Sequence, residues 1–347
     1  MTWLKIPVIS YSAETDQFLL FLQFCFRRVV QIHYNIENFK SRNPVVTVGI
    51  FDGVHRGHKY IINRLIEIAE VKGGESVVIT LWPHPRHVLN HDPSLTRLIT
   101  TLDEKIQILS EFDISHLVIL DFTHEFSRLL SHEFIKNILV DKIGIKHLVV
   151  GYNHRFGNDR EGDILRLQNH ASKHHFTVEQ LLSYGNGQQI ISSSLIRDAL
   201  LNGDIRTANE SLGHRFFISG KVIGGSRIGR SIGFPTANIR SEHPLKLLPK
   251  DGVYAAKVLI RDTWHFGMLN IGIRPTINDN PEHKTIEVHI IDFDKDIYNQ
   301  QVRIDLEERI RDEMKFATVD MLRDQLLKDK KVALEVFKRL DTGKGNT

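Results

Sequence analysis

The chain has 347 residues, which is long for one domain and suits two. Apolar residues make up 41% of it and charged residues 25%, as in an ordinary globular protein, and a net charge of +3 is too small to indicate a nucleic-acid partner. Cys25 is the only cysteine, which excludes a disulfide framework and a cysteine-based metal site, so we expect a cytoplasmic protein.

Residues 1–29 are an N-terminal extension of open status. They contain an apolar run, residues 18–26, followed by Arg27 and Arg28. The run is too short to span a bilayer, and its basic residues lie on the wrong side for a secretory signal. A short buried helix, an interfacial segment and a natural start of translation near Val30 all remain open, and we assign this segment no function.

Residues 45–69 predict a phosphate-binding loop. A β-branched run over residues 45–48 predicts a buried parallel strand, and the amphipathic residues 60–69 predict a helix. The glycine-containing turn between them would direct backbone N–H groups and the positive helix end at an anion. His55 and His58, three residues apart, would add donors on one side of the first helical turn.

A plain turn, a zinc site and a Walker A loop fit these two histidines less well. A turn with two solvated histidines does not account for the neighbouring glycines and the buried strand. A zinc site would need an intervening glutamate or a nearby cysteine, and a Walker A loop would need Gly-Lys-Ser/Thr after its glycines. The segment 49–58 resembles the HxGH nucleotidyltransferase signature of prokaryotic FAD synthetases.

This resemblance implies that the loop binds ATP while another phosphate attacks the α-phosphorus and pyrophosphate leaves, without a covalent enzyme intermediate. The implied ATP-binding residues of the loop are Gly49, Phe51, Gly53, His55 and His58, of which the two histidines are also the implied catalytic residues.

Up to about residue 212, strands and helices alternate. Short apolar runs over residues 76–81, 116–120 and 147–151 predict strands, and residues 103–110 and 132–139 predict helices. This alternation predicts a doubly wound α/β domain, in which ligands bind beyond the carboxyl ends of the strands.

Three segments after predicted strands carry further resemblances. Pro83-His84-Pro85 predicts an extended turn rather than a helix, although it could simply be a rigid loop that packs Trp82. It resembles the family's TFxPHP segment, which implies that Pro83, His84 and Pro85 bind the flavin.

The second segment, residues 151–163, resembles the family's VGxDFxFGxxRxG loop, although composition alone would also fit a surface turn. Asn153 stands where aspartate is usual, and it keeps hydrogen-bonding capacity without the charge. We expect Asn153 to contact ATP, whereas His154 replaces the usual phenylalanine and is assigned no role.

The third segment, residues 191–197, resembles the family's ISSxxIR motif. Ser192 or Ser193 is a suitable N-cap, and Arg197 early in the helix opposes the helix dipole unless an anion binds there. An ordinary capped helix with Arg197 in solvent is the alternative. The resemblance implies that Ser193 and Arg197 bind the triphosphate. Gly213 is expected to end the following helix.

After Gly213 the pattern changes from helical to alternating. Strands are expected over residues 217–223, 253–260, 264–271, 285–291 and 302–306, followed by an amphipathic helix over residues 318–340. These elements predict an antiparallel barrel or sandwich with a C-terminal helix.

The glycine-rich residues 220–238 predict a loop that approaches phosphate closely, although a hairpin without a ligand is the alternative. If the end of this segment is extended, Thr236 and Asn238 point the same way and supply two oxygen ligands suited to Mg²⁺. Farther on, Ile286, Val288 and Ile290 share a buried face and leave Glu287 and His289 on the other. An exposed strand glutamate usually has no function.

Several segments after Gly213 resemble riboflavin kinase: residues 233–238 (GFPTAN), 251–254, 270–272, 275–276 and 287–316. The resemblance implies that Glu287 is the catalytic base for the riboflavin hydroxyl and that Thr236 and Asn238 hold Mg²⁺ and nucleotide. The other implied residues are Gly220, Lys221, Gly229 and Gly233 for ATP, and Asn270 and Arg311 for the flavin.

From about residue 43 to residue 316, the chain resembles the bifunctional riboflavin kinase/FAD synthetase family. The implied fold is an α/β doubly wound nucleotidyltransferase domain followed by an antiparallel β-barrel riboflavin kinase domain with a C-terminal helix. The expected boundaries are residues 30–213 for the FMN adenylyltransferase domain and 214–347 for the kinase domain. ATP would phosphorylate riboflavin to FMN, and a second ATP would convert FMN to FAD and pyrophosphate.

The resemblance implies Mg²⁺ at both sites, with ATP, riboflavin and FMN as small-molecule partners and FAD as product. We expect no nucleic-acid or membrane partner, and a homo-oligomer remains open. Two rival hypotheses remain: an enzyme with one live activity, because Trp82, Asn153 and His154 depart from the family pattern, and a regulator that binds flavin or nucleotide. The intact Glu287 and His55 argue against the regulator.

Overall fold

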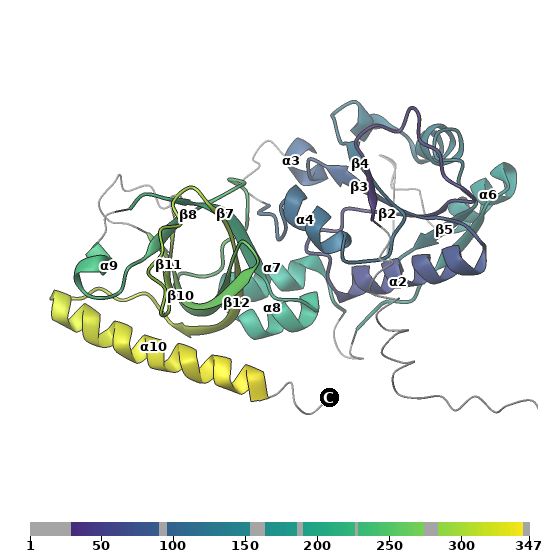
Figure 1. Ribbon diagram of the computed structural model, residues 1–347. Helices are drawn as coiled ribbons and strands as arrows, with labels where there is room; N and C mark the ends of the chain where they lie inside the picture. The colour runs from purple at the N-terminus through teal and green to yellow at the C-terminus, as the bar shows by residue number, and fades with distance from the viewer. Residues whose placement is uncertain are drawn as a thin grey trace, which may run out of the picture.

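The computed structural model describes residues 29–89, 96–152, 164–185, 190–225, 228–273 and 284–342. These residues form a parallel sheet flanked by helices and a closed barrel, with two helices between them (Figure 1). The predicted fold class is confirmed, and the closed barrel decides between the barrel and the sandwich that the sequence left open. Asn153 and His154 lie outside the described residues.

The sheet contains six parallel strands in the order β1-β4-β3-β2-β5-β6. They are β1 (Gln31–His33), β2 (Val45–Gly49), β3 (Ser76–Trp82), β4 (His116–Asp121), β5 (His147–Val150) and β6 (Thr177–Gln180). Strands β3 and β4 follow β2 on one side, whereas β5 and β6 lie on its other side. The chain therefore changes direction between β2 and β5, and such a switch point opens a crevice at the carboxyl ends of the strands.

The helices around the sheet correct two predictions. They are α2 (Arg56–Val71), α3 (Pro85–Leu89), α4 (Leu102–Leu109), the 3₁₀ helix η2 (Phe126–Arg128), α5 (Ser131–Glu133), the π-helix η3 (Phe134–Val140) and α6 (Ile164–His174). The helix predicted over residues 132–139 is one α-helical turn continued as a π-helix. The turn expected over residues 83–85 is shorter than predicted, because Pro85 begins α3, where a proline is tolerated in the first helical turn.

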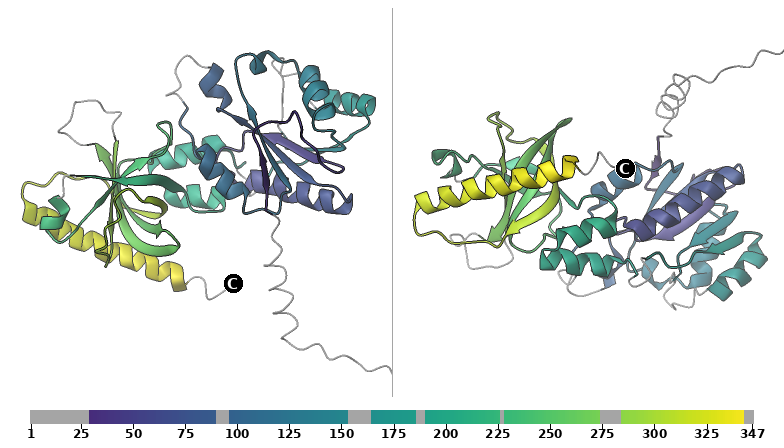
Figure 2. Two further views of the ribbon diagram at one scale, coloured as in Figure 1. Left: turned by 45° about the horizontal axis from the view of Figure 1, so that its top comes forward. Right: turned by 90° about the horizontal axis from the view of Figure 1, so that it is seen from below.

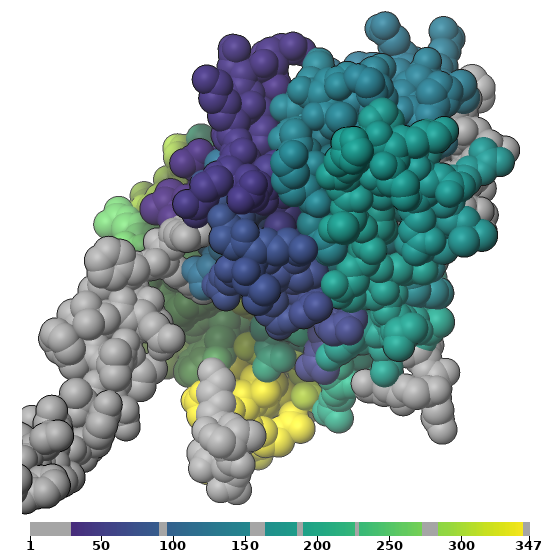
Figure 3. All heavy atoms as spheres, turned by 90° about the vertical axis from the view of Figure 1, so that its right-hand side faces the viewer, coloured from purple at the N-terminus to yellow at the C-terminus, as the bar shows by residue number. Residues whose placement is uncertain are grey.

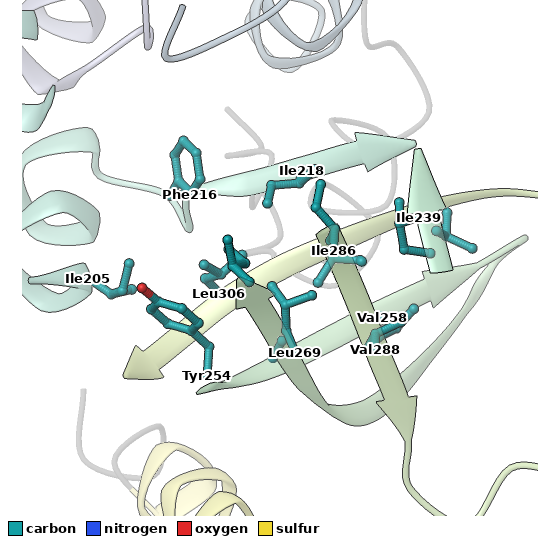
Figure 4. Packing of buried hydrophobic residues seen from close by; sticks show 14 of the residues in the cluster. Ile205, Phe216, Ile218, Ile239, Tyr254, Val258, Leu269, Ile286, Val288 and Leu306 are labelled. Atoms are coloured by element: carbon teal, nitrogen blue, oxygen red, sulfur yellow. The ribbon is translucent and has the colours of Figure 1, made fainter. Parts of the chain in front are cut away.

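Helices α7 (Ser193–Asn202) and α8 (Ile205–Leu212) lie between the sheet and the barrel (Figures 1 and 2). They end at Gly203 and Gly213, whose φ angles of 79° and 69° favour glycine, so the stop predicted at Gly213 is confirmed. Their apolar side chains belong to the same buried cluster as the barrel interior. Figure 4 places Ile205 of α8 at the end of this core that holds Tyr254.

The barrel closes in the strand order β10-β11-β8-β7-β12-β9. Its strands are β7 (Phe217–Ile223), β8 (Ala237–Ser241), β9 (Gly252–Ile260), β10 (Thr263–Ile273), β11 (Lys284–Ile290) and β12 (Gln301–Arg311), with the short helix α9 (Ile228–Ser231) between β7 and β8. The five predicted strands are confirmed to within a few residues, and β8 is an additional strand. Alternating side chains such as Ile286 and Val288 fill the interior (Figure 4).

The C-terminal helix α10 (Val319–Thr342) runs along the outside of the barrel (Figures 1 and 2). Its residues Ala333, Val336 and Phe337 are buried against Ala255 and Met268 of the barrel. Viewed from the sheet side, the first part of the chain fills most of the visible face (Figure 3). Within the residues that the structure describes, no helix combines the length and the apolar character needed to cross a membrane.

Candidate active sites

A cavity of about 840 Å³ lies at the carboxyl end of the parallel sheet. Its lining includes the end of β2, the start of α2, residues after β5 and the N-terminus of α7. The predicted residues that line it are Gly49, Phe51, His55, His58, His84, Pro85, Ser193 and Arg197. The switch point between β2 and β5 thus brings together segments from distant parts of the sequence, as expected of a doubly wound sheet.

His55 and His58 form a stacked pair in this cavity. His55 is the N-cap of α2, and its Nδ1 accepts a hydrogen bond from the backbone N–H of His58 at 3.3 Å. The two ring centroids are 3.6 Å apart, and the edge of Phe51 contacts the His58 ring. Burial lowers the pKa of His55 to about 4 and holds the pKa of His58 well below its usual range. Without ligand, both imidazoles are therefore neutral at pH 7.

The turn before α2 has an unusual backbone. Phe51, Gly53 and Val54 have φ angles of 50°, 83° and 39°. A Cβ atom at Gly53 would lie 3.0 Å from Ile99 and 3.2 Å from Leu212, so both the backbone and the packing favour glycine there. Gly53 is not among the cavity-lining residues, and its role is to let the turn form beneath the site.

Arg197 is held by Asp52 rather than free in solvent, so the alternative of a solvated arginine is wrong. Its Nη2 donates to Asp52 Oδ2, and its Nε donates to the Arg97 carbonyl at 3.0 Å. Asp52 Oδ1 also accepts from the backbone N–H groups of Ile99 and Thr100, both at 3.1 Å. Our prediction did not include Asp52 among the site residues. The Asp-Gly pair in the turn after β2 was the sequence feature that could have identified it.

The two serines of the α7 N-terminus have different roles. Ser192 is the N-cap and accepts from the backbone N–H of Leu195. Ser193 Oγ donates to the Asp52 carbonyl at 3.0 Å and lines the cavity. The choice left open by the sequence is therefore settled in favour of Ser192 as the cap.

Two of the three predicted residues after β3, His84 and Pro85, line the same cavity. His84 is buried, its Nδ1 accepts from the backbone N–H of Arg86, and burial lowers its pKa to about 4. Pro85 also lines the cavity, whereas Pro83 does not.

Lys105 of α4 is a buried residue near the cavity that sequence reasoning missed. Its Nζ donates to the Ile50 carbonyl at 2.7 Å and to Thr80 Oγ1 at 3.3 Å, and burial lowers its pKa to about 8. The lysine therefore ties the loop after β2 to β3. No local sequence pattern marks it, because its partners are 25 and 55 residues away.

A second cavity, of about 350 Å³, lies at the barrel. It is lined by Val222, Arg230, residues 235–237, Val288, Ile290 and residues 293–298. Thr236 is the predicted site residue that lines it. His289 lies on the outer face of β11 as predicted, yet it is buried, and its Nδ1 hydrogen-bonds with the Pro235 carbonyl at 2.8 Å. His289 therefore anchors the turn that carries Thr236.

Three predicted residues form a row across the outer face of the barrel. Glu287 of β11 is paired in register with Asn238 of β8 on one side and with Asn270 of β10 on the other. Directly opposed residues in antiparallel strands point to the same face. The flanking Ile286, Val288, Leu269 and Ile271 belong to the interior cluster, so the row points outward. A carboxylate is thus placed between two side-chain amides.

Arg311 lies near the same row. Val253 of β9 is paired with both Asn270 and Arg311, and it extends the row to β12. The guanidinium of Arg311 is bound by Asp329 of α10, with Nη2 donating to Oδ2 at 2.7 Å. The C-terminal helix thereby fixes the position of this arginine.

Local packing requires glycine at two of the predicted nucleotide-binding positions, Gly220 and Gly229, whereas at Gly233 the backbone conformation favours it. A Cβ atom at Gly220 would lie 2.6 Å from the Arg240 carbonyl oxygen, and one at Gly229 would lie 2.1 Å from that of Phe234. Gly233 has a φ of 82°. Lys221 is half-exposed in β7, beside Gly220.

The donor chemistry near Thr236 and Asn238 fits Mg²⁺. Magnesium prefers oxygen ligands and usually binds through a few protein groups together with substrate phosphates. Thr236, directly before β8, and Asn238, within it, provide a hydroxyl and an amide oxygen two residues apart. Among the described residues, no group of three or more histidine, cysteine or carboxylate side chains forms a ready-made metal cluster.

Comparison with protein families gives two matches in chain order. Residues 38–195 match the FAD synthetase model, and residues 212–337 match the riboflavin kinase model. The first match contains the lining of the sheet cavity except Arg197, which lies two residues beyond it, and the second contains the barrel cavity and the Glu287 row.

Curated relatives cover both halves. The chain is 36% identical over 307 residues to the bifunctional riboflavin kinase/FMN adenylyltransferase of Escherichia coli (strain K12), covering 88% of this chain and 96% of that protein. It is 36% identical over 310 residues to the protein of the same name from Bacillus subtilis (strain 168), covering 89% and 96%.

A crystal structure named as a macrolide-efflux protein from Streptococcus pneumoniae has the same fold, with a TM-score of 0.79 and 30% identity. It covers 88% of this chain and 98% of its own.

Proposed function

The chain belongs to the bifunctional riboflavin kinase/FMN adenylyltransferase family. We propose that adenylyl transfer takes place at the sheet cavity and phosphorylation of riboflavin at the barrel. The protein phosphorylates riboflavin with ATP to give FMN, and it joins FMN to AMP from a second ATP, giving FAD and pyrophosphate. The observation that carries the division is that each family model covers a different site. The first covers the sheet cavity that His55 lines, and the second covers the barrel cavity that Thr236 lines and the row of Glu287 on the outer face.

At the barrel, Glu287 is the proposed base. Its carboxylate would orient the riboflavin hydroxyl and accept its proton while the oxygen forms a bond to the γ-phosphorus of ATP, and the bond to the β-phosphate oxygen breaks to release ADP. Its place between Asn238 and Asn270 supports this role, because the amides on either side would hold nucleotide and flavin next to the carboxylate. Arg311, fixed by Asp329, is assigned to the flavin.

The nucleotide at the barrel is assigned to the glycine-rich segment and the turn that follows it. Gly220, Lys221, Gly229 and Gly233 would approach the ATP phosphates, and Thr236 and Asn238 would hold Mg²⁺. Bound there, Mg²⁺ would neutralise charge that develops on the transferred phosphoryl group. Thr236 lies on the cavity wall, which supports this placement.

At the sheet, the proposed reaction needs positioning and neutralisation of charge rather than a nucleophile from the protein. A phosphate oxygen of FMN would form a bond to the α-phosphorus of ATP, and the bond from that phosphorus to the departing pyrophosphate would break. His55, His58, Ser193 and Arg197 would bind the phosphates, with the loop residues Gly49 and Phe51 beside them. We also assign Mg²⁺ to this site.

Neutral histidines suit this role. Each imidazole can donate one hydrogen bond in its neutral form, and an incoming triphosphate favours the protonated form. The stacked pair can therefore gain positive charge when ATP binds. The flavin is assigned to His84 and Pro85 in the cavity wall, with Pro83 beside them, and Asn153 stays a proposed ATP contact.

The proposed domains are residues 30–213 for adenylyl transfer and 214–347 for phosphorylation, after an extension over residues 1–29. A cytoplasmic location and the absence of nucleic-acid and membrane partners are part of the same proposal. The rival hypothesis of a regulator without activity is disfavoured, because both halves match families of enzymes. The rival hypothesis of a single live activity is open to a direct test.

The decisive experiment follows flavins by chromatography while the purified protein reacts with riboflavin, ATP and Mg²⁺. We expect FMN to appear first and FAD to follow. Accumulation of FMN without FAD would show that the departures around Asn153 have silenced the first site. Omission of Mg²⁺ in the presence of a chelator should stop both steps.

A further inference from the structure

The carboxylate of Glu104 in α4 links the two halves of the molecule. Glu104 and its partner Lys246 each have only 1% of the side chain exposed. Glu104 Oε2 accepts from Lys246 Nζ and from the backbone N–H of Thr101, while Oε1 accepts from the backbone N–H of Ser219 at 3.0 Å. Lys246 and Ser219 lie beyond Gly213, in the barrel half. The N-terminal capping box of α4, Thr101 with Glu104, is thus held in place from the other half.

Lys246 also binds the segment 97–101 that precedes α4. Its Nζ donates to the Ile99 carbonyl at 2.7 Å. On either side of the lysine, the backbone N–H of Leu98 donates to the Leu245 carbonyl at 2.8 Å, and that of Leu247 donates to the Leu98 carbonyl at 2.7 Å. The ammonium group lies 4.5 Å from the centre of the Phe216 ring. The segment is therefore clamped to the barrel half by backbone and side chain together.

The other side of the same segment supports the sheet cavity. The backbone N–H groups of Ile99 and Thr100 hold the carboxylate of Asp52, which in turn holds Arg197. The Arg97 carbonyl accepts from Arg197 Nε, and Thr100 Oγ1 accepts from the backbone N–H of Gly53 at 3.0 Å. Residues 97–100 thus form a link that contacts the barrel half on one side and Asp52, Gly53 and Arg197 on the other.

We propose that Lys246, a residue of the kinase half, is a positioning residue for adenylyl transfer. It acts through Glu104 and segment 97–101 on Asp52 and Arg197. Removing its ammonium group would leave the Glu104 carboxylate buried without a countercharge, which is strongly unfavourable, so the capping box and the segment would move. A displacement of about 1 Å at a positioning group can cost roughly 100-fold in rate.

Lys246 neither lines the barrel cavity nor belongs to the row of Glu287, Asn238 and Asn270, so we expect riboflavin phosphorylation not to depend on it directly. The two reactions of one sample can therefore be compared. The inference rests on the role proposed above for Arg197. The test below distinguishes failure of the positioning role of Lys246 from failure of that role of Arg197.

The experiment measures adenylyl transfer from added FMN and ATP for Lys246→Met, Glu104→Gln and the double variant, with riboflavin phosphorylation measured on the same samples. We expect Lys246→Met to raise KM for ATP and lower kcat/KM of adenylyl transfer at least tenfold, while riboflavin phosphorylation stays within twofold of wild type. The double variant should be less impaired than Lys246→Met, because it leaves no unpaired buried charge.

Lys284→Met is the matched control. Lys284 forms an ion pair with Asp251 and a hydrogen bond with the Pro249 carbonyl, both in the barrel half, so adenylyl transfer should stay unchanged when its ammonium group is removed. Unchanged transfer in Lys246→Met, or an equal loss of both reactions with no recovery in the double variant, would overturn the proposal.

Arg197→Met distinguishes failure of this inference from failure of the proposed site. If that variant transfers AMP as well as wild type, the assignment of Arg197 is wrong, and the relay through it is wrong as well. If Arg197→Met is impaired and Lys246→Met is not, only the positioning role of Lys246 fails.

Discussion

Single residues set the chemistry of both cavities through their surroundings. Glu287 lies on the outer face of a barrel strand, where a glutamate usually has no function. Its proposed role depends on Asn238 and Asn270, which lie in register on either side of it. His55 and His84 are polar residues in buried positions, and burial keeps them neutral. Each residue can be tested separately.

Replacing Glu287 by glutamine should remove the proposed base while keeping size and hydrogen bonding. We expect kcat of riboflavin phosphorylation to fall about 100-fold or more, since a general base contributes roughly 10²- to 10⁴-fold. Adenylyl transfer from added FMN should be unchanged. Glu308→Gln is the control, because this carboxylate pairs with Arg339 of α10. A Glu287→Gln enzyme with normal phosphorylation would disprove the assignment.

Acid should destabilise the fold between pH 6.5 and pH 4. The pKa values of His55 and His84 are lowered to about 4, so in this window the unfolded chain binds protons that the folded protein does not. Stability is then fully present above pH 6.5 and is lost as the pH falls towards 4, by roughly 2–3 kcal/mol per histidine. Urea unfolding at several pH values measures this.

The variant His84→Gln should flatten that pH dependence, whereas His124→Gln, on the exposed surface, should leave it unchanged. If His84→Gln has the same slope of stability against pH as wild type, this histidine does not contribute to the acid sensitivity.

At the scale of elements, helix ends and strand register account for the geometry of the sites. His55 caps α2, Ser192 caps α7 and Asp204 caps α8, and each cap fixes where a helix begins. Registers between β8, β10 and β11 place the Glu287 row, which one residue of slip would turn to the other face. The sites therefore depend on where elements start as much as on which elements form.

Asp204→Ala tests one such cap. The Asp204 carboxylate accepts from the backbone N–H of Thr207, and its loss should lower the free energy of unfolding by about 1 kcal/mol. Chemical denaturation provides the measurement. Glu210→Ala, an exposed position farther along α8, should change the stability little; an equal loss in both variants would mean that helix composition, not the cap, matters.

At the scale of the molecule, the two halves share helices and a buried cluster. Helix α7 completes the nucleotide cavity through Ser193 and Arg197, yet the apolar side chains of α7 and α8 belong to the barrel core. The Lys246–Glu104 pair also joins the two halves. The fold type changes near Gly213, but the two halves are not independent cores separated by a gap.

Ile205→Ala tests this sharing. Ile205 is 1% exposed in the barrel core, so the substitution should destabilise the protein by about 2–4 kcal/mol. Because this cluster contains residues of both halves, the midpoints of urea inactivation should fall together for the two reactions. Leu201→Ala, at a position 53% exposed on α7, is the control. A shift in one midpoint alone would show that the halves unfold independently.

The sequence alone determined the order of elements, the fold of each half and most of the converging residues. Local patterns carry that information: β-branched runs, glycine turns and period-2 alternation depend on neighbours a few residues away. The short strands β1 and β6 were missed because they have three and four residues and weak patterns of their own. The helix predicted over residues 132–139 does form, but its π-helical part was not predicted.

Only the tertiary structure decided what depends on distant partners. It closed the barrel, aligned Asn238, Glu287 and Asn270, and paired Asp52 with Arg197, 145 residues away. It also buried Lys246 against Glu104, 142 residues away. The physical reason is that burial, ion pairing and register arise from contacts between segments far apart in the chain, and no local pattern encodes which of these segments will meet.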